Sequence, residues 1–397
     1  MSAPVAPTRG RPERRPVWTW LLPLMSVGLA LAIPLLVWYA ISAILDSTDG
    51  TVQEVVTDPN APGYEATVNP SPSHMVLSLD PAGDLSMVTI LSLGSNDIGG
   101  TVLHIAPETI LSGNPNFDRI VDAYRLEGAD RARRVVANLI DVNVDEVTVL
   151  DQAQWQLLTT PVGSIPVDIE ASLTELGDDG PMVVYPAGNV IVAPSDVSSF
   201  LGWVNPGEHP IDRSARHEAF WQAWLARITA SEDPDIVPGE VDSGIGRFVR
   251  GIAEATPLIE VPLATPLTLE SDVPGTEIDI PGLRLFVAEM IPFPLPASPG
   301  DRPTVKLLDG VGGLDLAGVY TPPIVRNRGR VITIGNVTPE FGVEQTSLVY
   351  HDRKWEAEAQ AIAAALGATE INFEAEDDVV FDVTVIIGED QGLALGD

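Results

Sequence analysis

The sequence predicts an α/β protein with an N-terminal transmembrane helix, a larger domain built on a mixed sheet, and a smaller α/β domain. Three observations predict this class. Residues 17–45 carry no charged side chain. Beyond them, short apolar runs typical of strands alternate with apolar patterns of helical period. The apolar content of 45% and the charged content of 20% are typical of packed globular domains.

Composition restricts the possible functions. The length of 397 residues allows more than one domain. With 56 acidic against 22 basic residues the net charge is −34, which repels nucleic acid, so we expect no nucleic-acid partner. Because the chain has no cysteine, disulfides, thiolate zinc sites and cysteine nucleophiles are excluded. The five histidines show no ligand spacing and predict no zinc site.

The uncharged segment, residues 17–45, has the length of a transmembrane helix. It would extend about 43 Å as a helix, more than the hydrocarbon core of about 30 Å. A cleaved signal peptide is the alternative, but its apolar region is usually shorter. Four arginines precede the segment: Arg9, Arg11, Arg14 and Arg15. Acidic residues follow it, so the positive-inside rule predicts a single-pass protein of the cell membrane, with residues 1–16 as a cytoplasmic tail and extracellular C-terminal domains.

The residues after the membrane segment predict a stalk and then a first domain. Residues 46–73 are rich in Pro, Asp, Thr and Gly, which is typical of a stalk. Residues 74–230 form the first domain. Its expected strands are apolar runs between turn residues: His74–Leu79, Ser86–Leu93, Thr101–Ile105, Val144–Leu150 and Val167–Ile169. Its expected helices have one apolar face: Ala129–Ile140, and Arg213–Ile228 with Asp212 as N-cap.

Two further segments complete the chain. Residues 231–301 contain repeated prolines, which predict an irregular extension or linker with one short helix near Arg247–Ala255. In residues 302–390 strands and a helix alternate again, which predicts the smaller α/β domain. Its helix is Glu356–Leu366, ended by Gly367. Its expected strands are Thr304–Leu308, Arg330–Ile334, Thr346–Tyr350 and Phe381–Ile387.

Several motifs in the first domain occur in the order of a known family. Asp84–Leu91 (DLSMVTIL) and Val102–Thr109 (VLHIAPET) look like a stretch written SDTMMLV…NP…VTLLSIPRDT. Arg119–Tyr124 (RIVDAY) is similar to KINAAY, and Asp212–Phe220 (DRSARHEAF) is similar to the helix start D..R..RQ. On these motifs residues 74–230 resemble the LytR-CpsA-Psr family.

The smaller domain has a resemblance of its own. Val305–Gly312 (VKLLDGVG) is similar to VxVLNGTG, and Asp382–Gly388 (DVTVIIG) is similar to a closing strand. On these two motifs residues 302–390 resemble the LytR C-terminal domain.

The resemblance implies chemistry at the cell envelope. Members of the family join anionic glycopolymers, carried on a polyprenyl pyrophosphate, to cell-wall peptidoglycan. They use arginines on the pyrophosphate and a divalent cation held by aspartates. Carried over by motif, Arg213 and Arg216 are the candidate pyrophosphate or anion ligands, and Asp80 and Asp84 are the candidate ligands of Mg²⁺. The two arginines could instead pair with nearby acids such as Glu208.

The chain departs from the family pattern at two places. Pro107 and Glu108 stand where the family has Arg-Asp, and Phe200–Val204 (FLGWV) stands where it has YVRxR. We therefore expect a protein that binds lipid-linked or wall-linked glycopolymer with weak or absent catalysis. The alternatives are a non-enzymatic envelope scaffold, or an active phosphotransferase that attaches anionic glycopolymer to peptidoglycan. In that enzyme the missing arginines would be replaced from one cluster: Arg125, Arg131, Arg133 and Arg134.

Overall fold

The computed structural model describes residues 56–94, 97–111, 118–177, 180–269, 273–376 and 380–392. The predicted cytoplasmic tail, the predicted transmembrane segment 17–45 and the first part of the predicted stalk lie outside these residues. Among the residues that are described, no helix combines the length and the apolar character needed to cross a membrane.

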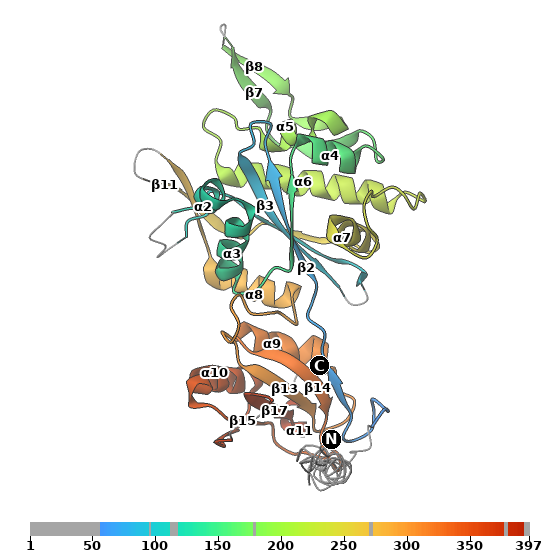
Figure 1. The fold of residues 1–397 in the computed structure, drawn as a ribbon, viewed down its shortest axis with the longest axis vertical. Coiled ribbons are helices and arrows are strands. Elements are labelled where there is room, and N and C mark those ends of the chain that lie inside the picture. The colour runs from blue at the N-terminus through green and yellow to red at the C-terminus, as the bar shows by residue number, and fades with distance from the viewer. Residues whose placement is uncertain are drawn as a thin grey trace, which may run out of the picture. The chain divides into compact units, whose positions relative to one another are not determined.

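A five-stranded mixed sheet forms the centre of the first part of the molecule (Figure 1). Its spatial order is β10 (Leu258–Glu260), β4 (Gly100–Ile105), β3 (Leu85–Leu93), β2 (Ser73–Leu79) and β5 (Glu146–Leu150). Strand β3 is antiparallel to both β2 and β4, whereas β5 and β10 are parallel to their neighbours. Every residue of β2 and β3 is buried, because helices cover both faces of the sheet. The α/β class with a mixed first sheet is confirmed.

Side chains of successive strand residues enter two separate cores. In β2, Val76 belongs to the first core, while Met75 and Leu77 belong to the second. The first core is covered by α4 (Gln152–Thr159), α5 (Val197–Gly202), α6 (Pro210–Thr229) and α7 (Gly244–Ala253). The second core is covered by α2 (Ile120–Glu127), α3 (Ala129–Ile140) and α8 (Ile280–Met290).

Helix α6 supplies most of the large side chains of the first core. Phe220, Trp221 and Trp224 are fully buried and pack around Trp155 of α4. The helix begins at Pro210, three residues before the predicted start, and His209 is its N-cap. Asp212, the predicted N-cap, is the third helical residue, and its carboxylate accepts from the His209 amide at 3.2 Å. Proline suits the first turn of a helix, where its missing N–H costs nothing.

Two antiparallel strand pairs precede α6, and the β7–β8 hairpin lies between β6 and β9 in the chain. Strand β6 (Ile165–Ile169) pairs with β9 (Gly188–Val192), and β7 (Leu173–Gly177) pairs with β8 (Gly180–Tyr185). The short helical turn η2 (Pro194–Asp196) leads from β9 into α5.

The prediction of an irregular extension over residues 231–301 is wrong. This segment forms α7, β10, the hairpin of β11 (Ala264–Thr268) with β12 (Pro274–Ile278), and α8. Strand β10 adds to the edge of the first sheet beside β4. The prolines that suggested a linker occupy positions that tolerate proline: Pro281 lies in the first turn of α8, and Pro266 and Pro274 lie in a two-stranded hairpin.

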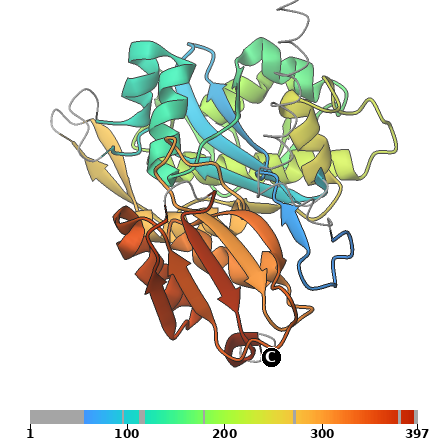
Figure 2. The ribbon, with the colours of Figure 1, turned by 60° about the horizontal axis from the view of Figure 1, so that its bottom comes forward.

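A six-stranded mixed sheet forms the last part of the molecule. In Figure 2 it is orange to red, except for its one N-terminal strand, which is blue. Its order is β1 (Glu65–Thr67), β14 (Arg330–Asn336), β13 (Thr304–Asp309), β17 (Val383–Ile387), β15 (Ser347–Tyr350) and β16 (Glu370–Phe373). The helical segments in this part of the chain are η4 (Leu316–Tyr320), α9 (Thr321–Arg326), η5 (Arg353–Trp355), α10 (Glu356–Leu366) and α11 (Glu389–Gly392). Because β1 belongs to this sheet, residues 65–67 are part of the folded structure and not of a stalk.

Candidate functional site

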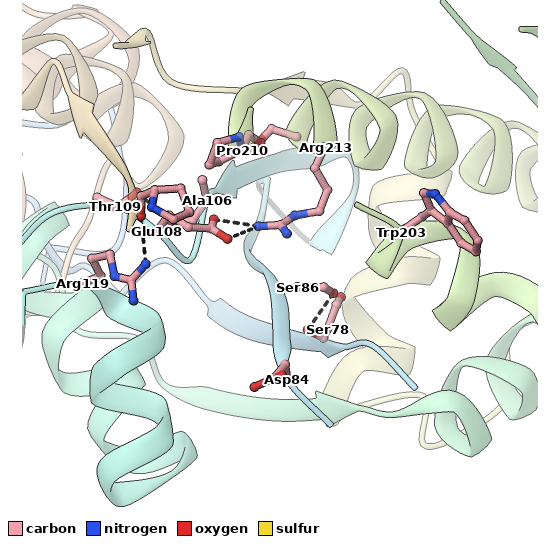
Figure 3. Close-up of polar contacts among 12 residues, drawn as sticks. Ser78, Asp84, Ser86, Ala106, Glu108, Thr109, Arg119, Trp203, Pro210 and Arg213 are labelled. Carbon is pink, nitrogen blue, oxygen red and sulfur yellow. Dashed lines mark hydrogen bonds and ion pairs between the residues drawn. The ribbon is translucent and has the colours of Figure 1, made fainter. Parts of the chain in front are cut away.

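The first two turns of α6 carry the two arginines that the motif assigns to anion binding. The first of them, Arg213, donates through Nη2 to both carboxylate oxygens of Glu108, at 2.5 and 2.6 Å (Figure 3). Glu108 lies in the loop after β4. Both side chains are largely buried, with 9% and 13% of their surface exposed. The charge of Arg213 is therefore neutralised by a carboxylate of the same chain.

Arg216 is held in the same way. Its Nη1 lies 2.9 Å from Oε1 of Glu208, and its Nη2 donates to the backbone carbonyl of Trp203. Only 4% of the Arg216 side chain and 6% of the Glu208 side chain are exposed. Burial lowers the pKa of Arg216, and Glu208 opposes that shift because it favours the charged guanidinium.

The loop that presents Glu108 is held by a hydrogen bond to β12 and by one within the loop. The Thr276 amide of β12 donates to the Glu108 carbonyl at 3.0 Å, and the Thr109 hydroxyl donates to the Ala106 carbonyl at 2.6 Å. Beside it, Arg119 donates to the Pro274 carbonyl at 2.8 Å (Figure 3). This carboxylate is thus positioned against Arg213 by a rigid frame.

At Gly202, where the family pattern has its first YVRxR arginine, there is no room for a side chain. Gly202, the last residue of α5, packs against Asp80, and a Cβ at position 202 would lie 2.5 Å from the Asp80 Cβ. No side chain, and therefore no arginine, fits there without movement of the backbone. Val204 occupies the other arginine position of the pattern and is exposed.

The two candidate metal ligands serve other contacts. Oδ1 of Asp80 accepts from the amides of Ala82 and Asp84, both at 2.9 Å, so it stabilises the turn between β2 and β3. Oδ1 of Asp84 accepts from Arg125 at 3.0 Å. Within the described residues no group of three or more acidic or histidine side chains could hold a metal ion.

The arginine cluster on α2 and α3 contacts residues of those helices and of neighbouring loops. Arg125 pairs with Asp84, and both Arg131 and Arg134 lie near Glu127. Arg133 donates to the Val144 carbonyl at 3.2 Å. The structure therefore does not bring these side chains to Arg213 and Arg216.

A groove of about 910 Å³ lies along the outer face of α6 and was not predicted. We call it the α6 groove. The β6–β9 hairpin, the 205–208 loop and α6 form its walls. Its carboxylates are Asp168, Glu170, Glu208, Asp212 and Glu218, and its amide side chains are Asn189, Asn205 and Gln222. Burial raises the pKa of Glu218, and the nearby Glu260 raises it further.

The groove gave no signal in the sequence for a physical reason. Its polar residues occupy the outward positions of an amphipathic helix and a hairpin, which are polar in any surface element. These polar residues form one concave surface only because β6 packs close to α6.

Two buried histidines lie behind the arginines. His104 of β4 and His217 of α6 are fully buried, with ring centroids 6.0 Å apart. The His104 Nδ1 lies 2.9 Å from the Thr89 hydroxyl. Burial lowers the pKa of His104 to about 3. Burial, His104 and the two arginines also place the pKa of His217 well below its ordinary value.

Comparisons with known proteins give fold similarity only. No protein-family model and no curated protein matches the sequence. Among solved structures, the chain is similar to Bacillus subtilis TagV, with 15% identity and a TM-score of 0.45 over 56% of this chain and 98% of that one. A transcriptional regulator from Enterococcus faecalis has 15% identity and a TM-score of 0.43 over 56% and 87%. Bacillus subtilis TagT has 13% identity and a TM-score of 0.43 over 56% and 90%.

Proposed function

We propose that this chain is a membrane-anchored protein of the cell envelope that binds a lipid-linked or wall-linked glycopolymer and transfers it weakly or not at all. The proposal rests on one observation: the two arginines of the motif already form ion pairs within the chain. Arg213 and Arg216, which the motif assigns to pyrophosphate, are bound by Glu108 and Glu208 of the same chain.

Transfer from a pyrophosphate carrier needs cationic donors that meet the charge developing on phosphate. A pyrophosphate that approached α6 would have to displace two carboxylates that are already aligned and buried. The positions that could add further cations hold Pro107, Gly202 and Val204. These side chains cannot stabilise an anion, so weak or absent catalysis follows.

The α6 groove supports binding of the sugar part of such a polymer. Carboxylate and amide oxygens accept hydrogen bonds from sugar hydroxyls, and amide nitrogens donate to them. Arg216 also lines the groove, where it is paired with Glu208. The four other carboxylates repel the phosphates of an anionic chain, so the groove favours an uncharged glycan segment. Its volume of about 910 Å³ lies within the range of small-ligand sites.

The rest of the chain supports a position outside the cytoplasm. The uncharged residues 17–45, preceded by four arginines, support a membrane anchor. The second sheet contains the two motifs that are similar to the LytR C-terminal domain, and we assign residues 302–390 to that type. Magnesium binding by Asp80 and Asp84 stays a prediction from the motif.

The first test removes the carboxylate that pairs with Arg213. In the full-length chain in a non-ionic detergent, Glu108→Gln removes the charge that holds Arg213. We expect the affinity for a polyprenyl pyrophosphate, measured by titration calorimetry, to rise about tenfold, because a charge-assisted contact of about 1.4 kcal/mol becomes available. The control is Glu127→Gln, which removes the carboxylate that pairs with Arg134 of α3 and should leave the affinity unchanged.

The second test measures binding and transfer by the wild type. Soluble glycan strands should bind with saturation, and Asp168→Ala with Glu170→Ala should weaken that binding about tenfold, because both substitutions remove acceptor oxygens. Transfer of labelled glycopolymer to peptidoglycan should stay near background. Efficient transfer by the wild type would refute the weak-catalysis part, and absence of glycan binding would refute the binding part.

A further inference from the structure

A second concave site lies on the far side of the first sheet from α6, where α3 and α8 meet α9 and α10. It is a cleft of about 340 Å³. We call it the arginine cleft, after four of its lining residues: Arg284, Arg302, Arg326 and Arg328. Two acids, Asp141 and Glu358, line it as well, which leaves an excess of two positive charges. In a chain with a net charge of −34, such a local excess is contrary to the average.

Arg302 forms the buried base of the cleft. Only 5% of its side chain is exposed, and its Nη2 lies 3.0 Å from the Asp141 carboxylate. It also donates to the backbone carbonyls of Asp141 and Val325. Burial lowers the pKa of Arg302, and the like charges of Arg328 and Arg284 lower it further although Asp141 opposes them. Without an anion, the arginines of the cleft repel one another.

The other arginines keep unused capacity. Arg284 of α8 is exposed and makes no hydrogen bond or ion pair with any residue in the described ranges. Arg328 donates through Nη2 to the Asp301 carbonyl at 2.9 Å, and the same atom lies 3.7 Å from Oδ1 of Asp141. Its Nε is buried without a hydrogen-bond partner among the described residues. Arg326 pairs with Glu289 of α8, and 36% of its side chain is exposed.

The backbone holds two of these side chains in an unusual conformation. Asp141 and Arg328 have φ values of 59° and 66°, in the left-handed region that non-glycine residues rarely adopt. Such conformations persist where the surroundings over-determine them, and they gather at binding sites.

We propose that the arginine cleft binds a phosphate oxyanion, either a phosphate monoester or a phosphodiester. Planar guanidinium groups match phosphate oxygens with paired N–H donors, and this is why arginine is the residue type used for phosphate. The cleft volume admits one phosphate group with its immediate substituent. The site is separate from the arginines of α6 and from the α6 groove, and the inference stands without the proposed function.

Titration calorimetry of the full-length chain in a non-ionic detergent tests this site. The probes are inorganic phosphate, glycerol 3-phosphate and the diester of phosphate with two glycerols, at low ionic strength. We expect saturable binding of at least one probe. Arg284→Gln and Arg326→Gln should each weaken it about tenfold, and 0.5 M salt should weaken it strongly, because the site is accessible to solvent ions.

Arg134→Gln is the matched control, since it removes one positive charge from an exposed position outside the cleft and should leave binding unchanged. Binding of the diester as tightly as of phosphate would identify a phosphodiester chain as the ligand, and preference for phosphate and the monoester would identify a terminal phosphate. No saturable binding of any probe, or equal binding by the two cleft variants and the wild type, would overturn the proposal. These readouts do not depend on pyrophosphate affinity at Arg213.

Discussion

The proposed function depends on the ion pairs of two residues, Arg213 and Arg216. Removing water from two charges costs several kcal/mol per ion, and their attraction repays this only where geometry and additional hydrogen bonds are good. Glu108 provides both oxygens to Arg213, and Trp203 adds a carbonyl to Arg216. The buried Nε of each arginine has no hydrogen-bond partner among the described residues. An external anion nevertheless competes with a carboxylate that is already in place at each arginine.

Gly202 offers a direct test of the steric account of the missing arginine. In Gly202→Ala the new Cβ would lie 2.5 Å from the Asp80 Cβ and 2.9 Å from its Cα. Because backbone must move to relieve this, we expect a loss of about 1–3 kcal/mol in the free energy of unfolding, measured by urea denaturation. The control is Gly177→Ala, whose Cβ meets nothing closer than 3.4 Å. Equal stabilities of the two variants would show that position 202 has room for a side chain.

At the scale of elements, the packing of α6 on the first sheet determines the chemistry around the arginines. The helix covers the sheet with Phe220, Trp221 and Trp224, and this aromatic layer also encloses His104 and His217. In an environment without water the neutral imidazole is favoured, so both rings are kept uncharged beside two arginines. Protonation of either ring would place an additional positive charge in the core.

This packing predicts a pH dependence of stability. Above pH 6.5, the ordinary pKa of histidine, His104 is neutral in both states and contributes no pH dependence. As the pH falls from 6.5 towards the folded-state pKa of about 3, only the unfolded chain binds the proton, so stability falls by about 1.4 kcal/mol per pH unit.

Urea denaturation at pH 7.5 and pH 5 measures this effect. His104→Asn should reduce the acid-induced loss of stability by about 2 kcal/mol relative to the wild type. His351→Asn, which changes a partly exposed histidine of the second sheet, is the control. An identical pH dependence in His104→Asn and the wild type would contradict the buried neutral state of His104.

At the scale of the whole molecule, one buried ion pair joins the end of α3 to the start of the second sheet. Arg302, two residues before β13, donates to the carbonyl and carboxylate of Asp141 at the end of α3. Removal of one partner of a buried pair is costly, since the other charge stays buried and unpaired.

Arg302→Leu should therefore lower the free energy of unfolding by about 3–5 kcal/mol. The matched control is Arg125→Leu, because its ion pair with Asp84 is about half exposed on both sides and such a surface pair contributes at most about 1 kcal/mol. Denaturant unfolding of both variants gives the comparison. A small effect of Arg302→Leu, similar to that of Arg125→Leu, would show that this pair does not stabilise the described structure.

The sequence by itself determined the elements that local pattern specifies. Strands β2 and β3 were predicted to within one residue at each end, because they are rich in apolar residues and bounded by turn residues. Helices α3 and α10 were predicted with their bounds, since an apolar face marks α3 and Gly367 ends α10 in a left-handed conformation with φ of 67°. The motif also singled out Arg213 and Arg216 as candidate anion ligands.

Only the tertiary structure decided what those residues do. Glu108 and Arg213 are 105 positions apart, and β10 joins β4 from a segment rich in proline. Pairings over such distances depend on the packing of the whole chain, which leaves no local signal in the sequence. The same holds for the α6 groove and the arginine cleft, because surface polar residues become a site only when separate elements bring them together.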